Sequence, residues 1–206
     1  MKKLHNIFLK HGCDKGTKHP YAKVYEKDMK KLKDEEINIC EIGIFKGSSI
    51  EAWVDYFPNA NIYGVDTFQR IKPEEIEILN HPRVHWLEAD SLKAGVSMKA
   101  RKAWGDVKFD YIIDDGMHTP EANAKTFENF IHLLKDDGVY YIEDTFPIDI
   151  MTMDEMNIDW IRQRSDSYNM LKMNQFLNSI SSYKVTRHDM RKEAKTPDSY
   201  IFRIEK

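Results

Sequence analysis

The chain has 206 residues, of which 41% are hydrophobic and 32% are charged, and its formal net charge is −3. This length and hydrophobic content can bury one core, so we expect a single domain. The charges of both signs are spread along the chain without a long basic block, which makes nucleic acid a poor candidate partner. We find no apolar run of the length that a signal peptide or a membrane span needs, so we expect a soluble, cytoplasmic protein with no membrane partner.

The first part of the chain is predicted to be a helix that precedes the sheet. Tyr21, Val24, Tyr25, Met29 and Leu32 fall on one stripe of this leading helix, which we interpret as a face that packs on the sheet. The two cysteines of the chain, at positions 13 and 40, are expected to be free thiols, because the second lies inside an apolar strand pattern.

Short apolar runs then alternate with helical periodicity, which is typical of a parallel sheet covered by helices on both faces. Five runs are predicted to be strands, namely 38–42, 61–65, 84–87, 109–113 and 139–142.

Two helices are predicted between these strands. The first covers 49–56, and Ser48 followed by Glu51 predicts a capping box at its start. The second covers 120–134, with Thr119 as its N-cap and a proline in its first turn.

The pattern changes after the fifth strand. A helix around 168–180 leads into segments 183–188 and 199–204, which we predict to be antiparallel neighbours joined by a turn that contains Pro197 and Asp198. We therefore predict an α/β, Rossmann-like fold, with a seven-stranded, mostly parallel sheet, a C-terminal antiparallel hairpin, and helices on both faces.

A strand, a glycine turn and a helix start follow one another in segment 39–49. Gly43 can take backbone angles that other residues avoid, and Gly47 would let the chain pass close to a ligand at the amino end of the helix. A nucleotide-like ligand fits this arrangement, although tight turns often contain glycine for no other reason. The segment lacks G-x-G-x-x-G, which counts against an NAD-type fingerprint.

Acidic side chains end the next two predicted strands. Asp66 lies about twenty residues after the glycine turn, where ribose hydroxyls are usually held. Asp90, followed by Ser91, could accept a hydrogen bond from an adenine amino group. Each acid alone would be interpreted as a solvated loop residue or a helix cap, but their order at successive strand ends favours a nucleotide-like cofactor.

This order, E-I-G-x-x-x-G followed by Asp66 and Asp90, resembles the class I S-adenosylmethionine-dependent methyltransferases over nearly the whole chain. The resemblance implies S-adenosyl-L-methionine as cofactor, with Glu41 beneath it, Asp66 at the ribose, and Asp90 with Ser91 at the adenine. The full set of cofactor-binding residues that we predict is Glu41, Gly43, Gly47, Ser48, Asp66, Asp90, Ser91 and Asp114.

Four carboxylates follow the fourth and fifth predicted strands: Asp114, Asp115, Glu143 and Asp144. Adjacent parallel strands would bring them to one edge of the sheet, where they would repel one another unless a proton or a cation relieves them. Oxygen ligands with room left for water and substrate suit Mg²⁺. Because successive strand residues point to opposite faces, Asp114 and Asp115 are not expected to share one role.

His118 follows at the entrance to the next helix, within reach of the same edge. A neutral imidazole beside a metal-bound hydroxyl is a natural general base, worth on the order of 10²- to 10⁴-fold in rate. A lone histidine before a helix is more often a surface residue or a cap. The D-D-G-x-H spacing, joined to a later I-E-D at a strand end, favours the catalytic interpretation.

These two motifs resemble a narrower family, the metal-dependent sugar O-methyltransferases of macrolide and rhamnosyl antibiotic tailoring, with the related cephalosporin hydroxylase-type proteins. By position, the resemblance implies that Asp115, Glu143 and Asp144 bind Mg²⁺ and that His118 is the base. The segment 14–21, D-K-G-T-x-H-x-Y, also resembles a segment that these proteins place near the cofactor.

The resemblance implies methyl transfer to a hydroxyl of a sugar or sugar-containing small molecule. A homo-oligomer is possible for such a protein and stays an open alternative. A single methyltransferase domain would cover 1–206, with a leading helical segment (1–35), a cofactor- and metal-binding core (36–145), and a substrate loop, last helix and closing hairpin (146–206). Within the last part, 151–167 would lie beside the acceptor pocket as a lid or substrate loop.

Three alternatives remain. A catechol-type O-methyltransferase also uses Mg²⁺, but it usually has a lysine base and a D-D-x-N-type ligand set, whereas this chain has D-D-G-x-H. A noncatalytic cofactor-binding or assembly protein of the same fold would not need the intact carboxylates and histidine. An iron-dependent hydroxylase is disfavoured because the sequence has no clear set of two histidines and one carboxylate.

Overall fold

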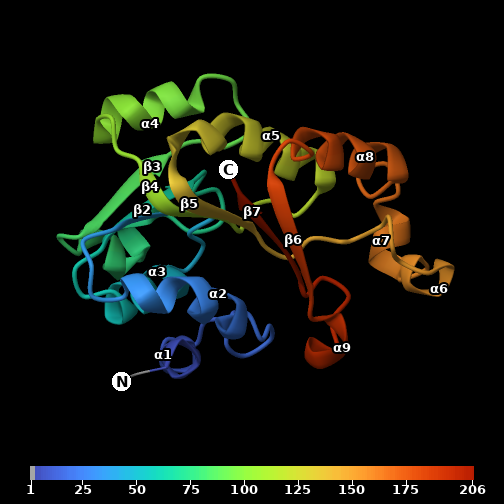
Figure 1. The fold of residues 1–206 in the computed structure, drawn as a ribbon, viewed down its shortest axis with the longest axis horizontal. Helices are drawn as coiled ribbons and strands as arrows, with labels where there is room; N and C mark the ends of the chain where they lie inside the picture. Colours follow the sequence, from blue (N-terminus) through green and yellow to red (C-terminus); the bar gives the residue numbers. More distant parts are fainter. Residues whose placement is uncertain (1–2) are drawn as a thin grey trace.

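A seven-stranded sheet runs through the centre of the molecule (Figure 1). The computed structural model describes residues 3–206, so the first two residues of the predicted domain and leading segment lie outside the described residues. The strands are β1 (Asn38–Ile42), β2 (Asn61–Asp66), β3 (Val84–Glu88), β4 (Phe109–Asp114), β5 (Leu134–Ile142), β6 (Lys184–Asp189) and β7 (Tyr200–Glu205).

The strand order is β3-β2-β1-β4-β5-β7-β6. β1 to β5 pair in parallel, and β7 pairs antiparallel with both β5 and β6. The predicted Rossmann-like sheet with a C-terminal antiparallel hairpin is therefore confirmed. The parallel strands all end at one edge, which is where ligands bind in open sheets of this kind.

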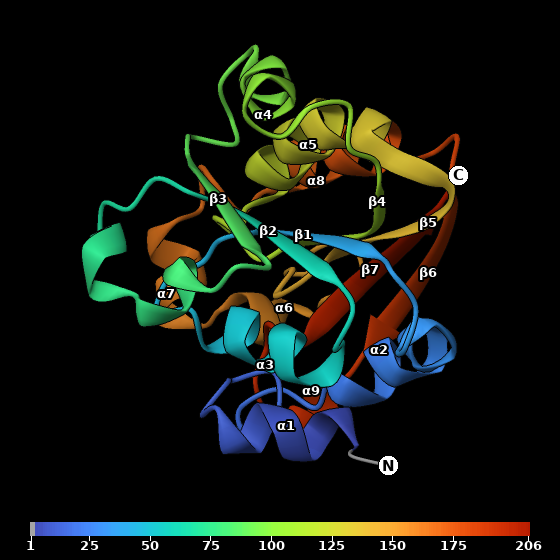
Figure 2. The same ribbon diagram turned by 90° about the vertical axis from the view of Figure 1, so that its left-hand side faces the viewer.

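Helices cover both faces of this sheet, as Figures 1 and 2 show. One face carries α1 (Leu4–Lys10), α2 (Ala22–Met29) and α3 (Ser48–Tyr56), and the other carries α4 (Val96–Trp104), α5 (Pro120–Phe130) and α8 (Met170–Ser179). The shorter helices are α6 (Met153–Met156), α7 (Asp159–Gln163) and α9 (Arg191–Ala194), with 3₁₀ turns at Lys30–Leu32, Pro73–Glu75, Glu77–Asn80 and Ile131–Leu133.

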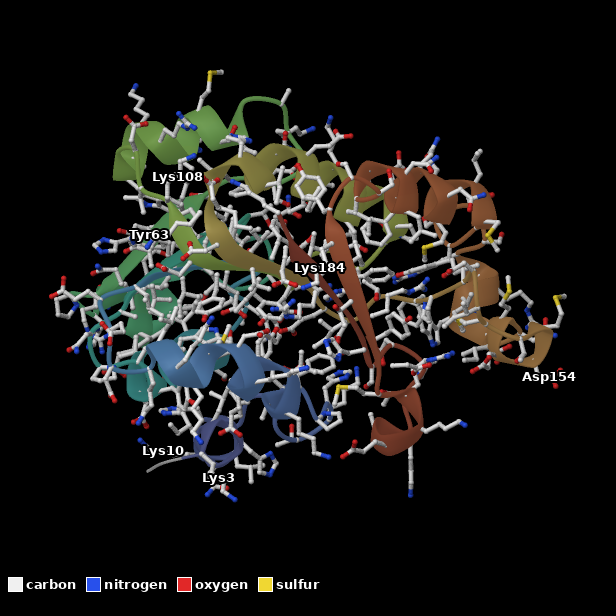
Figure 3. All side chains as sticks on the ribbon, in the orientation of Figure 1. Lys3, Lys10, Tyr63, Lys108, Asp154 and Lys184 are labelled. Atoms are coloured by element: carbon white, nitrogen blue, oxygen red, sulfur yellow. The ribbon has the colours of Figure 1, made fainter. Side chains whose placement is uncertain are left out.

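Each face of the sheet buries its own hydrophobic cluster. In β5, Tyr141 packs in the cluster beneath α1 to α3, whereas its neighbour Tyr140 packs in the cluster beneath α5 and α8. Side chains that alternate between two buried faces explain why the strands are continuous apolar runs. Charged side chains such as Lys10, Lys108 and Asp154 lie at the periphery (Figure 3).

The predicted end of the helix over 120–134 is wrong, although its start is confirmed. The Thr119 side chain accepts a hydrogen bond from the Ala122 N–H, as an N-cap does. The helix ends at Phe130, and a 3₁₀ turn leads to Leu134, which already pairs with Phe109 of β4. The apolar residues of the turn are buried and imitate a continued helical pattern, so periodicity alone could not locate this boundary.

The predicted capping box at the start of α3 is also wrong. Gly47 is the N-cap, with φ 81° and ψ 3°, and Ser48 is the first helical residue, so no side chain caps this helix. The chain enters α3 through a left-handed backbone conformation, which glycine adopts without the clash that a Cβ causes.

Gly47 and Gly95 form a matched pair for testing how tightly this turn is packed. Gly95 is the N-cap of α4 with φ 82° and ψ 1°. A Cβ on Gly47 would lie 2.7 Å from Ile78 Cγ2 and 2.8 Å from Ile76 Cγ2, whereas a Cβ on Gly95 would meet only Met98 Cε at 3.5 Å.

We expect Gly95→Ala to lower the free energy of unfolding by about 1–2 kcal/mol through backbone strain alone. Gly47→Ala should lower the free energy of unfolding by roughly 1–3 kcal/mol more than Gly95→Ala, because Ile76 and Ile78 must shift. Urea titrations of both variants measure the difference, and equal losses would show that the Ile76–Ile78 contact is not tight.

Candidate active site

A cavity of about 1180 Å³ lies along the edge where the parallel strands end. A single small-molecule site usually takes about 300–1,000 Å³, so this cavity has room for a cofactor together with a second small molecule. Among the predicted cofactor-binding residues, Gly43, Ser48, Asp66, Asp90 and Ser91 line the cavity, whereas Glu41, Gly47 and Asp114 do not.

The glycine turn after β1 is pressed against the end of β4. Gly43 has φ +98°, and a Cβ there would lie 2.1 Å from the carbonyl oxygen of Asp115. Glycine is therefore required both for the backbone angle and for the close approach. This contact brings the cofactor end of the cavity next to the carboxylates that follow β4.

Asp66, at the end of β2, holds the same turn. Its Oδ2 accepts hydrogen bonds from the backbone N–H groups of Ile44 at 2.7 Å and Phe45 at 3.0 Å, and its Oδ1 accepts one from Phe68 at 2.8 Å. A ribose bound by Asp66 would share the carboxylate with these N–H groups. The sequence pattern located Asp66 at the cavity but could not reveal its contacts with the turn.

The remaining predicted cofactor residues differ in whether they line the cavity. Asp90 accepts a hydrogen bond from the Leu92 N–H at 2.9 Å, and it lines the cavity beside Ser91. Asp114 is buried behind the cavity, where the Asn123 amide lies 3.5 Å from its Oδ2. Burial raises the pKa of Asp114 to about 7. Asp115 lines the cavity whereas Asp114 does not, and their separate roles stay a prediction.

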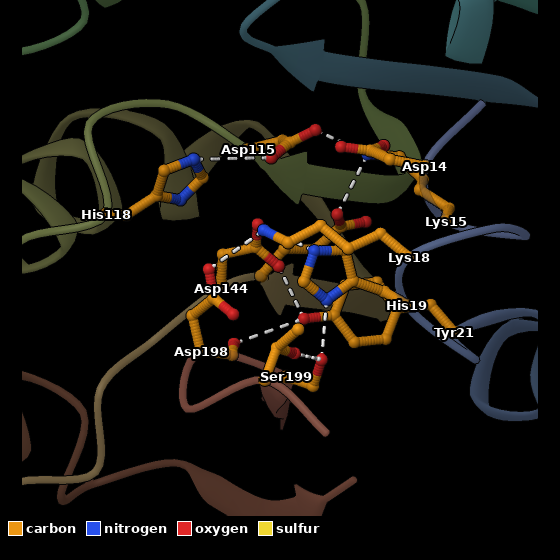
Figure 4. Close-up of polar contacts among 12 residues, drawn as sticks. Asp14, Lys15, Lys18, His19, Tyr21, Asp115, His118, Asp144, Asp198 and Ser199 are labelled. Carbon is orange, nitrogen blue, oxygen red and sulfur yellow. Dashed lines mark hydrogen bonds and ion pairs between the residues drawn. The ribbon is translucent and has the colours of Figure 1, made fainter. Parts of the chain in front are cut away.

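Asp115, His118 and Asp144 converge in the cavity. Each offers one ligand atom, and these atoms lie within 4.8 Å of one another. His118 Nε2 is 3.6 Å from Asp115 Oδ1, as Figure 4 shows. His118 and Asp144 have φ 57° and 50°, values that are uncommon outside glycine and that concentrate at functional sites.

Glu143, the third predicted metal ligand, does not line the cavity. It is buried, and its two oxygens accept hydrogen bonds from Tyr25 and from Lys15 Nζ. Burial is the main cause that raises the pKa of Glu143 well above its usual value. The structure therefore brings together two of the three predicted carboxylate ligands at the cavity, with His118 beside them.

Lys15 is a site residue to which the sequence alone assigned no role. Its side chain is 1% exposed, and its Nζ contacts Asp115, lies 2.8 Å from Glu143 and lies 3.3 Å from Glu41. Burial alone would lower the pKa of Lys15, but the three carboxylates outweigh burial and raise it well above the usual value. The D-K-G-T-x-H-x-Y resemblance was the only signal for this lysine.

Glu41 lies deeper in the fold, on β1. It is fully buried, and the indole N–H of Trp53 donates to its Oε2 at 3.0 Å. Burial raises the pKa of Glu41 to about 7, although Lys15 opposes that rise. Its contacts make Glu41 part of the support for Lys15.

The same amino-terminal segment also reaches Asp144. Tyr21 donates a hydrogen bond to Asp144 Oδ1, and His19 Nε2 lies 3.5 Å from Asp144 Oδ2 (Figure 4). His19 Nδ1 contacts Ser199 Oγ at 2.6 Å, and burial lowers the pKa of His19. The helical stripe that contains Tyr21 was interpreted only as a packing face, so its hydroxyl contact was missed.

Aromatic side chains form one wall of the cavity near Asp144. Phe146 lies 4.3 Å from Trp160 and 5.2 Å from Tyr168 between ring centroids, and all three rings line the cavity. Trp160 is in α7, inside the segment 151–167 that the sequence predicted as a substrate loop. The structure therefore brings this segment to the cavity.

α2, which presents Tyr25 to Glu143, is fixed to the sheet by Asp28. The Asp28 carboxylate accepts hydrogen bonds from Arg203 Nε at 2.6 Å and Nη2 at 2.9 Å, and from the Tyr141 hydroxyl. Burial would raise the pKa of Asp28, but these hydrogen bonds outweigh burial and hold the pKa below its usual value.

Comparison with known proteins identifies the class of protein. A family model described as a methyltransferase domain matches residues 40–145, and the chain belongs to this family. Of the helices in residues 3–206, none has the length and apolar character needed to cross a bilayer.

Two curated relatives are O-methyltransferases whose names contain a rhamnosyl or an olivosyl group. The chain is 30% identical over 148 residues to 8-demethyl-8-alpha-L-rhamnosyl tetracenomycin-C 2'-O-methyltransferase of Streptomyces olivaceus, covering 68% of this chain and 37% of that protein. It is 30% identical over 151 residues to L-olivosyl-oleandolide 3-O-methyltransferase of Streptomyces antibioticus, covering 69% of this chain and 37% of that protein. The chain thus spans little more than a third of these relatives.

A solved structure shares the fold over nearly the whole chain. MycE methyltransferase from the mycinamycin biosynthetic pathway, in complex with Mg and SAH, superposes with a TM-score of 0.69. The match covers 99% of this chain and 54% of that chain, at 18% identity.

Asp28→Asn should weaken the attachment of α2 in a pH-dependent way. A carboxyl whose pKa is lower in the folded state stabilises the fold above its unfolded pKa of about 3.9, and this stabilisation is lost as pH falls through the lowered value. We expect the variant to lose about 1–3 kcal/mol of unfolding free energy at pH 7 and a smaller amount at pH 3, where the stabilisation has begun to disappear.

Urea unfolding at both pH values measures this difference. Asp159→Asn is the control, because Asp159 pairs with Arg162 at an exposed position and should contribute little at either pH. If Asp28→Asn lowers the free energy of unfolding equally at pH 3 and pH 7, the charge of Asp28 does not contribute to stability as proposed.

Proposed function

We propose that this chain is an S-adenosylmethionine-dependent O-methyltransferase that methylates a hydroxyl of a sugar or sugar-containing small molecule, with Mg²⁺ as metal and His118 as general base. The observation that carries the proposal is one continuous cavity, which joins the glycine turn and Asp66 at one end to His118 and Asp144 at the other. Membership of the methyltransferase-domain family supports the same reaction class.

The cofactor end of the cavity suits a nucleoside. Asp66 and Asp90 lie at the ends of two adjacent strands, β2 and β3, and both line the cavity with Gly43. Carboxylates in these positions can accept hydrogen bonds from ribose hydroxyls and from an adenine amino group. S-adenosylmethionine would supply the activated methyl group.

The residues present also fit a divalent cation. Asp115 and Asp144 offer oxygen atoms to a cation, and a ring nitrogen of His118 lies within 4.8 Å of them, beside the cation rather than on it. Glu143, which the resemblance adds as a third carboxylate ligand, would have to exchange its contact with Lys15 for the cation. A bound Mg²⁺ would supply Lewis acidity to the acceptor hydroxyl.

The chain's own residues would orient the acceptor and take its proton. The rings of Phe146, Trp160 and Tyr168 offer apolar faces for a sugar ring, and they exclude water from one side of the cavity. His118 Nε2 faces the carboxylate pair, where an acceptor hydroxyl would lie, and is the atom that we propose takes the proton. His118 Nδ1 has no hydrogen-bond partner among the described residues.

The sugar acceptor is supported by relatives rather than by the cavity alone. The curated relatives act on rhamnosyl and olivosyl groups by name. A MycE structure contains Mg, SAH and Mycinamycin VI together. The cavity volume of about 1180 Å³ is compatible with a cofactor and a glycoside.

A catechol-type enzyme with a lysine base is less well supported. Lys15 is a lysine within the site, but three carboxylates raise its pKa well above the usual value. An ammonium group held in that form cannot accept a proton from a hydroxyl. The imidazole of His118 is therefore the better base.

Asp66→Ala should weaken binding of S-adenosylhomocysteine by roughly 1.5–3 kcal/mol, the range for hydrogen bonds to a charged group. The loss combines a missing ribose contact with the freed N–H groups of Ile44 and Phe45. Isothermal calorimetry measures the affinity, with Asp106→Ala as a control at an exposed position. Unchanged affinity in Asp66→Ala would remove Asp66 from the cofactor site.

His118→Ala should separate the base from the metal ligands. We expect it to lower the turnover rate by about 10²-fold or more, to abolish the limb of the pH–rate profile that reports imidazole ionisation, and to leave cofactor affinity nearly unchanged. Asp115→Asn should instead raise the Mg²⁺ concentration needed for activity.

An assay of S-adenosylhomocysteine release at increasing Mg²⁺ concentration, with a panel of sugars and glycosides as acceptors, measures both variants. It distinguishes loss of the base from weaker metal binding. If His118→Ala keeps normal turnover, or loses activity only through weaker metal binding, the base assignment is wrong.

A further inference from the structure

Lys15 connects the amino-terminal segment to three strands of the sheet. Its ammonium contacts Glu41 on β1, Asp115 after β4, and Glu143 after β5, which lie 26 to 128 residues away along the chain. At 1% exposure, the side chain has almost no contact with solvent. A buried ammonium with three carboxylate partners from separate strands is far from the ordinary surface role of lysine.

The local backbone is built to deliver this side chain. Gly16 packs so closely that a Cβ on it would lie 2.5 Å from Phe8 Cβ of α1. The Thr17 and His19 N–H groups both donate to the Asp14 carbonyl oxygen, which closes a compact turn around Lys15. The turn therefore fixes the lysine beneath the sheet edge before the chain enters α2.

The carboxylates around Lys15 need a positive charge. Glu41 and Glu143 are 0% and 1% exposed, and burying unpaired charges is strongly unfavourable. Glu41 Oε1 has no hydrogen-bond partner among the described residues and has only the Lys15 ammonium, at 3.3 Å, as an ion-pair partner. Lys15 is the group that offsets this charge.

The contacts of Lys15 also decide which carboxylate atoms remain available. Asp115 uses Oδ2 for Lys15, so Oδ1 is left facing His118. Glu143 uses Oε2 for Lys15, with its other oxygen on Tyr25. The lysine thus occupies one oxygen of Asp115 and one of Glu143, and the other oxygen of Asp115 lies beside His118.

We propose that Lys15 is a positioning residue and a built-in counter-charge, which keeps Glu41, Asp115 and Glu143 assembled when no divalent cation is bound. Its role toward a cation rests on the proposed function, whereas its role in assembling the acidic cluster does not. A divalent cation is then a second positive charge that joins a site already folded.

Thermal unfolding of Lys15→Met tests this proposal, because methionine keeps most of the volume and removes the charge. The variant and the wild type are unfolded in EDTA, in Mg²⁺, and in KCl of the same ionic strength. Lys23→Met is the matched control, since Lys23 pairs with Glu193 at a position that is 68% exposed.

In EDTA, we expect Lys15→Met to lower the unfolding midpoint by roughly 10 °C, the effect of leaving a buried charge unpaired in a chain of this size. Lys23→Met should change it by less than about 2 °C. Mg²⁺ should raise the midpoint of Lys15→Met by several degrees more than it raises the midpoint of the wild type, and KCl should raise the two midpoints equally.

Two outcomes would overturn the proposal. The first is that Lys15→Met unfolds in EDTA at the same midpoint as the wild type. The second is that Mg²⁺ raises the midpoints of the variant and the wild type equally, which would mean that Lys15 has only a packing role. If Lys15→Met does not fold, Lys15→Met/Glu41→Gln removes one negative charge as well and should restore folded protein. A double variant no more stable than the single one also overturns the proposal.

Failure of the proposed function gives a different pattern. Calorimetry with S-adenosylhomocysteine and the methyl-transfer assay are run on the wild type in parallel. If the wild type neither binds S-adenosylhomocysteine nor transfers a methyl group, the methyltransferase assignment is wrong. The unfolding midpoints in EDTA, and their recovery through Glu41→Gln, would still show whether Lys15 is the counter-charge.

Discussion

The ion cluster beneath the cavity is the interaction on which the rest of the site depends. Parallel strands bring their carboxyl ends to one edge, and in this chain those ends carry acidic side chains that cannot share a buried space uncompensated. The Lys15 ammonium reaches Glu41, Asp115 and Glu143 from outside the sheet. The amino-terminal segment is therefore a part of the site, and its helices must pack before the acidic edge is stable.

The cofactor end of the cavity depends on close backbone contacts. Gly43 touches the carbonyl of Asp115 at a distance that excludes any side chain, and Asp66 holds the neighbouring N–H groups of the turn. These contacts hold the ends of β1, β2 and β4 together, so the glycine turn and Asp115 lie side by side in the cavity.

The end of the cavity around Asp144 combines oriented charge with apolar surface. Asp144 is held by Tyr21 and has His19 nearby, while Phe146 and Trp160 form a wall from the segment after β5. The amino-terminal segment and the segment 151–167 thus line the same cavity, although they lie more than 120 positions apart in the chain.

The sequence by itself determined the elements whose signal is local. Apolar runs located the parallel strands, Thr119 marked a helix start, and acidic residues at strand ends located the edge of the sheet that carries the cavity. The end of α5 and the N-cap of α3 were predicted wrongly, because buried turns imitate helical periodicity and because a left-handed backbone leaves no polar signature. Only the tertiary structure decided the partners of each acid, such as Lys15 on Glu143, since a contact across 128 residues is set by how segments pack and not by spacing along the chain.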